Sequence, residues 1–144
     1  GHAKDYVEVM WKILQADTPE DWVIATGVTT SVRDFVKMAF AYLGITLTFK
    51  GQGEKEVGIV TSTQNPKWQV KEGQEVVAVD PRYYRPTEVD LLIGDPTKAK
   101  EKLGWKPTHT VKDLVDDMMQ SDLKLMEKEK MLKDKGFKPL NYFE

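Results

Sequence analysis

The chain has no cysteine, only two histidines and no long apolar run, and each absence excludes a class of site or protein. Without cysteine there are no disulfides and no cysteine-based zinc sites, and nothing indicates an oxidising compartment. His2 and His109 are too far apart in the sequence to form a helical metal pair, although folding can still bring them together. No apolar run suits a bilayer span, and the first residues do not resemble a signal peptide. We therefore expect a cytoplasmic protein that binds no metal and no membrane.

An excess of positive charge is also missing. The chain has 21 basic and 23 acidic residues, which gives a net charge of -2 at neutral pH. Because no basic arm is present, affinity for nucleic acid through phosphate neutralisation is not expected. The 144 residues suit one domain with one core, so we predict a single domain over residues 1–144 with a possible flexible tail over 137–144.

Helix-like and strand-like patterns alternate along the chain, which predicts a mixed α/β fold with short strands. Asp5 is a candidate N-cap for a first helix, and Ser31 with Asp34 forms a variant capping box for a second. The remaining predicted elements are strands at residues 22–25, 45–49, 57–61 and 75–79, a short helix capped by Asp95 and closed by Gly104, and a long helix from Thr110.

The most informative stretch runs from residue 79 to residue 107. It contains DPRYYRPTEVD at residues 80–90, where Arg85 and Glu88 stand three apart in a segment that proline keeps extended. It then contains GDPTKAKEKLGWKP at residues 94–107, which has the start and stop signals of a short helix. We expect the first motif to form the site and the second to be structural.

These motifs resemble the extended short-chain dehydrogenase/reductase family, whose substrate-binding part carries Arg-Pro-x-Glu-Val, Asp-Pro-x-Lys-Ala and Leu-Gly-Trp-x-Pro. The resemblance is fuller to the branch of that family that dehydrates GDP-mannose. It is carried by GHAKDYVE at residues 1–8, VIATG at 23–27 with SVR at 31–33, and YYRPTEVD at 83–90. It covers most of the chain in the family's order and departs between Gln52 and Glu75.

The family resemblance implies that this chain is a C-terminal substrate-binding part without the Rossmann cofactor domain. The family's catalytic Tyr-x-x-x-Lys pair is absent, since none of the five tyrosines has a lysine four residues later. The sequence GQGEKE at residues 51–56 lacks the third glycine of a cofactor loop and predicts a turn. We expect no catalytic residue and no bound cofactor in this chain, and NADP in the full-length enzyme.

The resemblance implies that Arg85 and Glu88 belong to a nucleotide-sugar site. A guanidinium can donate two parallel hydrogen bonds to phosphate, and a carboxylate can accept from ribose hydroxyls or from the guanine edge. From the residues alone, a surface ion pair fits equally well. Tyr84 and Arg33 are further candidates, with Tyr83 directed the opposite way into the core because neighbouring side chains of an extended segment alternate.

The activity that the resemblance implies is that of an NADP-dependent lyase that converts GDP-mannose to GDP-4-keto-6-deoxymannose, on the route to GDP-fucose and related deoxysugars. The expected partners are GDP-mannose or GDP, the missing N-terminal Rossmann half, and further copies in a homo-oligomer. Two alternatives remain open: a free-standing nucleotide-sugar-binding module, and an assembly module without a ligand.

Overall fold

The computed structural model describes residues 1–85 and 92–138, which form four α-helices and a three-stranded sheet. This confirms the predicted mixed α/β fold. The helices are α1 (Ala3–Leu14), α2 (Val32–Tyr42), α3 (Thr97–Leu103) and α4 (Val111–Asp134), and the strands are β1 (Ile45–Lys50), β2 (Val57–Thr63) and β3 (Glu75–Ala78), with a 3-10 turn η1 (Gly53–Lys55) between the first two.

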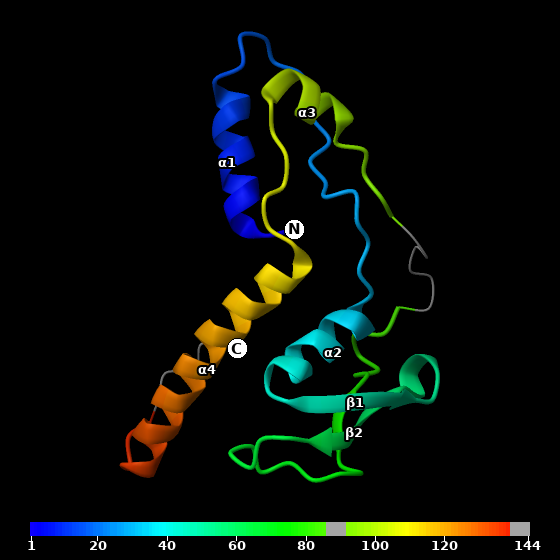
Figure 1. The fold of residues 1–144 in the computed structure, drawn as a ribbon, viewed down its shortest axis with the longest axis vertical. Helices are drawn as coiled ribbons and strands as arrows, with labels where there is room; N and C mark the ends of the chain where they lie inside the picture. The colour runs from blue at the N-terminus through cyan, green and yellow to red at the C-terminus, as the bar shows by residue number, and fades with distance from the viewer. Residues whose placement is uncertain (86–91, 139–144) are drawn as a thin grey trace.

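The sheet is antiparallel, with the strand order β1-β2-β3, and α2 lies along it (Figure 1). The alternation that predicted these strands places Ile45 and Leu47 of β1 with Val60 of β2 in a buried cluster. Val36 and Phe40 of α2 pack against this cluster, so the helix covers the apolar side of the sheet.

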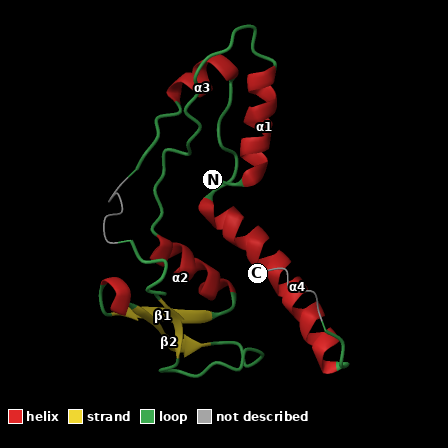
Figure 2. Cartoon of the chain, turned by 180° about the vertical axis from the view of Figure 1, so that it is seen from behind, coloured by secondary structure: helices red, strands yellow, loops and turns green. Residues whose placement is uncertain are grey.

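A second buried cluster joins α1 to α3, in place of the single core expected from the chain length. Val9, Ala99 and Trp105 form its centre, and Trp22 and Ile24 pack against it. Figures 1 and 2 show α1 and α3 side by side at the end of the molecule away from the sheet, with α4 starting beside the first residues of α1. The described residues therefore form two buried clusters, and α4, which contacts α2, extends from one toward the other.

The predicted caps are largely confirmed. The Ser31 side chain accepts a hydrogen bond from the Asp34 backbone N–H at 3.0 Å. The Asp95 carboxylate accepts from the Thr97 N–H at 3.0 Å, but the N-cap of α3 is Pro96 rather than the predicted Asp95, so this helix begins one residue later than predicted. Gly104 follows α3 at φ +60°, in the left-handed region that glycine adopts without strain. Local chemistry thus sets these helix boundaries.

Two predictions about the first 25 residues are wrong. The N-cap of α1 is His2, whose Nδ1 accepts from the Lys4 N–H at 3.2 Å, while Asp5 is buried inside the first turn. Residues 22–25 are extended but do not form a strand within the part of the chain that the structure describes. Trp22 and Ile24 pack against the α1–α3 cluster but Val23 is 52% exposed, so the apolar run predicted neither the strand pairing nor the full burial.

The chain after α4 is described only as far as residue 138. The Phe137 N–H donates to the Leu132 carbonyl at 2.9 Å, just beyond Gly136, which closes the helix. Most of the predicted tail over residues 137–144 lies outside the described residues. Among the residues that are described, no helix combines the length and the apolar character needed to cross a membrane.

Trp105 links the two parts of the sequence that build the α1–α3 cluster. Its side chain is 1% exposed, and its Nε1 donates to the Asp5 backbone carbonyl at 3.0 Å. Tyr6 meets the indole edge-on with the ring centroids 6.5 Å apart. The Leu-Gly-Trp-x-Pro motif therefore supplies both apolar area and a hydrogen bond to α1.

We predict that Trp105→Phe lowers the free energy of unfolding by about 1 to 3 kcal/mol, because it removes packed volume and the buried hydrogen bond between the indole and α1. Trp11→Phe is the matched control, since Trp11 is 62% exposed, and it should change stability by less than about 0.5 kcal/mol. Urea unfolding of both variants measures the difference, and equal effects would contradict this role of Trp105.

Candidate functional site

The structure describes three of the four predicted substrate-binding residues. Arg85 is exposed in the segment that follows β3, and Glu88 lies outside the described residues. Tyr84 is 37% exposed and its hydroxyl lies over Gly53, so close that a Cβ added to that glycine would be 3.0 Å from Tyr84 Oη. Tyr84 therefore packs against the turn that joins β1 to β2.

Arg33 lies in the first turn of α2, as predicted, and its side chain reaches Glu56 at the end of the same β1–β2 turn. Its Nε donates to Glu56 Oε1 at 2.7 Å, and its Nη2 lies 2.6 Å from the same oxygen. The guanidinium carbon also lies 5.7 Å from the centroid of the Phe49 ring, within the range of a cation–π contact. Carboxylate and ring together define where the guanidinium sits.

Arg33 and Tyr84 thus both contact the turn over residues 51–56, and Arg85 follows Tyr84 in the chain. The sequence predicted a turn here, and the structure confirms it as η1. Gly51 has φ +87°, and a Cβ at this position would lie 2.1 Å from the Lys55 carbonyl oxygen, so the turn closes only around glycine. In Figure 1 the segment that leads to residue 85 passes the start of α2.

The neighbouring Tyr83 and Arg82 do not share this arrangement. Tyr83 was expected in the core, but it is 77% exposed and the Arg82 guanidinium lies over its ring at 5.6 Å. Arg82 Nη2 donates to Asp80 Oδ2 at 2.7 Å, and this hydrogen bond keeps the pKa of Asp80 below its ordinary value. Arg82 is therefore committed to a carboxylate two residues away.

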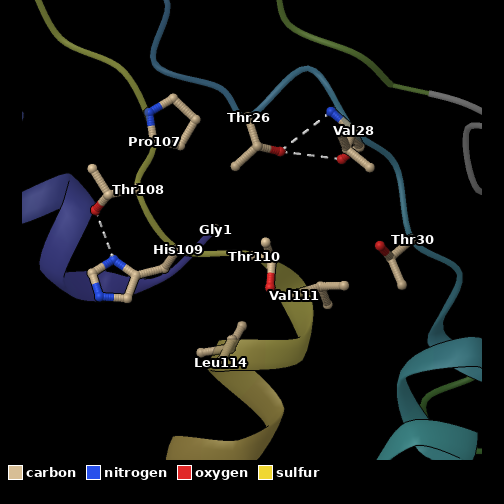
Figure 3. Close-up of a pocket in the computed structure, with 10 residues that line it drawn as sticks. All are labelled: Gly1, Thr26, Val28, Thr30, Pro107, Thr108, His109, Thr110, Val111 and Leu114. Atoms are coloured by element: carbon tan, nitrogen blue, oxygen red, sulfur yellow. Dashed lines mark hydrogen bonds between the residues drawn. The ribbon is translucent and has the colours of Figure 1, made fainter.

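A cavity of about 520 Å³ lies elsewhere, and none of the three predicted site residues that the structure describes lines it (Figure 3). Residues 26–30 form one wall and residues 107–114 the other, with Gly1 between them. Its polar lining includes Thr26, Thr30, Thr108 and Thr110, while Val28, Val111 and Leu114 supply apolar surface. Sequence reasoning missed this cavity because its walls come from three separate segments.

A buried carboxylate supports the back of this cavity. Asp5 is 2% exposed, and it accepts hydrogen bonds from Thr108 Oγ1 at 2.7 Å and from the His109 backbone N–H at 3.1 Å. His109 Nδ1 lies 2.8 Å from the same carboxylate. Burial alone would raise the pKa of Asp5, but the hydrogen bonds from Thr108 and His109 outweigh it and hold the pKa well below the usual range.

Folding also brings the two histidines together. The rings of His2 and His109 stack with centroids 4.5 Å apart, and His2 Nε2 lies 3.2 Å from Asp117 Oδ2 on α4. Figure 3 shows the His109 ring directed toward α1 rather than toward Thr26 and Val28. Within residues 1–85 and 92–138, no group of three or more potential ligands could hold a metal ion. The cluster therefore joins the starts of α1 and α4.

Comparison with known proteins agrees with the sequence motifs. A family model described as GDP-mannose 4,6 dehydratase matches residues 1–118. The chain belongs to the GDP-mannose 4,6-dehydratase family. A GDP-mannose 4,6-dehydratase from Vibrio cholerae is 53% identical over 137 residues, which are 94% of this chain and 37% of the relative. The human GDP-mannose 4,6 dehydratase is 52% identical over 126 residues, which are 88% of this chain and 32% of the relative.

The chain thus spans about a third of the length of these dehydratases. A third relative, GDP-mannose 4,6 dehydratase 2 from Caenorhabditis elegans, gives the same proportion, with 50% identity over 91% of this chain and 32% of the relative. The activity of these relatives is therefore that of polypeptides about three times as long as the matched region.

We predict that Asp5→Asn lowers the free energy of unfolding at pH 7 by about 2 to 3 kcal/mol, because the amide cannot accept from all of its present donors. The folded-state pKa of Asp5 is depressed, so its contribution is complete above the ordinary aspartate range and is lost as the pH falls through the folded value. The difference between wild type and variant should therefore shrink below about pH 4. Denaturant unfolding across pH measures it.

The exposed Asp17 offers a matched control for this substitution. Asp17→Asn should change the unfolding free energy by less than about 0.5 kcal/mol at every pH. A difference between wild type and Asp5→Asn that stays constant from pH 7 to pH 3 would contradict the role given to the ionised carboxylate.

Proposed function

We propose that the chain is the nucleotide-sugar-binding part of a GDP-mannose 4,6-dehydratase, from the C-terminal side of an enzyme of the extended short-chain dehydrogenase/reductase type. The proposal is supported above all by one observation: Arg33 and Tyr84, more than fifty residues apart in the sequence, each contact the turn over residues 51–56, and Arg85 directly follows Tyr84. Family membership supports the choice of GDP-mannose as the substrate. The single binding domain over residues 1–144 stays a prediction.

The chemistry of this corner suits a nucleoside diphosphate sugar. Two arginines supply planar donors for the diphosphate, and the Tyr84 ring offers a face for a base or ribose. Glu88 belongs to the proposed site by its motif, where a carboxylate would accept from the N1-H and N2-H edge of guanine. Uracil cannot present that pair of donors, so the proposal includes a preference for GDP over UDP.

The cofactor and the chemical steps belong to the part of the enzyme that lies outside this chain. NADP is the proposed cofactor, but the described residues do not fit it: the turn over residues 51–56 presents Glu54 where a pyrophosphate needs N–H donors, and Tyr84 covers Gly53. We assign no step of the lyase reaction to residues of this chain. Its contribution is to select the nucleotide sugar and position it. A cytoplasmic location remains a prediction from the cysteine-free composition.

A calorimetric titration of the chain with GDP and with UDP, in the same buffer and salt, tests the proposal. We expect saturable binding of GDP in preference to UDP, and at least a tenfold loss of affinity in Arg85→Ala, which removes a charged hydrogen bond worth about 1.5 to 3 kcal/mol. Arg82→Ala is the matched control, because Arg82 is committed to Asp80, and it should bind GDP as the wild type does. Absence of GDP binding by the wild type would count against the proposal.

We also propose that the chain self-associates. α1 carries a stripe of apolar side chains directed away from the core, at the i, i+3, i+4, i+7 spacing of one helix face. Val7, Met10, Trp11 and Leu14 are 65%, 61%, 62% and 80% exposed. Such a surface promotes contact between copies when nothing else covers it. In the complete enzyme, the missing Rossmann half is the proposed neighbour.

We expect sedimentation velocity to show oligomers that increase with protein concentration, and we expect Trp11→Glu to shift the chain toward monomer, because a charge in the stripe opposes its burial. Lys112→Glu, an exposed change on α4, is the control and should leave the distribution unaltered. A wild-type chain that stays monomeric at high concentration would contradict self-association.

A further inference from the structure

Glu56 is notable because its carboxylate accepts hydrogen bonds from Arg33, one of the proposed binding residues. Its side chain is 20% exposed, whereas that of Arg33 is 52% exposed, so the carboxylate is the more enclosed partner of the pair. It follows directly after η1, and its backbone N–H donates to the Gly53 carbonyl at 3.2 Å. The backbone of the turn, closed at Gly51, therefore sets the position of Glu56 independently of Arg33.

The contact uses only one edge of the guanidinium. Nε and Nη2 both approach the same oxygen of Glu56, at 2.7 and 2.6 Å. These described contacts leave the Nη1 donors and the outer Nη2 donor uncommitted, and that outer edge has the geometry for two parallel hydrogen bonds to a phosphate. The Phe49 ring, 5.7 Å from the guanidinium carbon, sets the third constraint on its position.

We propose that Glu56 is a positioning residue for Arg33, which it holds by the inner edge so that the outer edge is presented to the diphosphate of the nucleotide sugar. This inference rests on the proposed function. Holding a long side chain in one rotamer before the ligand arrives avoids the entropic cost of ordering that side chain at the moment of binding. The turn that carries Glu56 also touches Tyr84, so one local structure supports two of the binding residues.

A plain surface ion pair would behave differently, and the sign of the effect separates the two roles. A carboxylate beside a phosphate-binding arginine weakens the local positive potential, so if Glu56 had no positioning role its removal would tighten binding of an anionic ligand. If Glu56 positions Arg33, removing it weakens binding even though the net charge becomes more favourable. A neutral side chain that still accepts a hydrogen bond should then restore affinity.

The test is a calorimetric titration of the chain with GDP and with guanosine, for the wild type, Glu56→Ala and Glu56→Gln. We expect Glu56→Ala to raise the Kd for GDP about fivefold to tenfold and to leave that for guanosine within twofold. Glu56→Gln, which keeps the accepting oxygen without the charge, should bind GDP at least as tightly as the wild type. Glu54→Ala, an exposed carboxylate on the same turn, is the matched control and should not weaken GDP binding.

The NMR signal of the Arg33 Nε–H reports the position of the guanidinium without any ligand. It should be sharp and slowly exchanging in the wild type and in Glu56→Gln, and it should broaden in Glu56→Ala. If the wild type binds GDP and Glu56→Ala binds it equally or more tightly, this inference is overturned and the proposed function is not. A wild type that does not bind GDP overturns the proposed function, and this inference with it.

Discussion

The buried carboxylate of Asp5 is the interaction on which the arrangement of this chain depends most. It accepts hydrogen bonds from residues more than a hundred positions later, and the Asp5 backbone carbonyl accepts from Trp105 in the same region. An ionised group at 2% exposure is tolerable only when its donors are all in place. The first turn of α1 and the segment that leads into α4 therefore depend on each other for their folded positions. One wall of the 520 Å³ cavity is built from that segment.

A second constraint governs the proposed binding corner, and it comes from backbone rather than from charge. The turn over residues 51–56 closes tightly enough that Gly51 admits no side chain and Gly53 meets Tyr84. Arg33 and Tyr84 arrive from different elements, yet both rest on this turn. The corner thus owes its geometry to a short stretch in which the sequence departs from the motifs that carry the family resemblance.

The features that the sequence predicted are those with local causes. Ser31, Asp95 and Gly104 influence the backbone only within a few residues of their own positions. The β1 and β2 strands follow from the local pattern of apolar residues, and they pair with each other as neighbours in the sequence. Family motifs reached further and indicated Arg33, Tyr84 and Arg85, of which the structure brings the first two to one turn. Neither route indicated the partner of Arg33, because Glu56 becomes relevant only when β1 and β2 pair.

The failures have the opposite cause. Aspartate is a common N-cap residue, but the Asp5 carboxylate is hydrogen-bonded to Thr108 and His109, which are distant in the sequence. His2 is the N-cap instead. Residues 22–25 form the short apolar run typical of a buried strand, but pairing needs a neighbouring strand, and such a run does not say whether one exists. The cavity depends on three segments at once. Each miss is therefore a property of the assembled chain that no single window of sequence contains.

The contact between Gly53 and Tyr84 has an evolutionary consequence. Gly53 has φ +58°, and any side chain there would run into the tyrosine hydroxyl within 3.0 Å. Substitution at residue 53 therefore requires the Tyr84 ring to shift or residue 84 to become smaller, while a smaller residue 84 leaves the turn uncovered. The two positions should vary as a pair among descendants of this chain, although thirty residues separate them in the sequence.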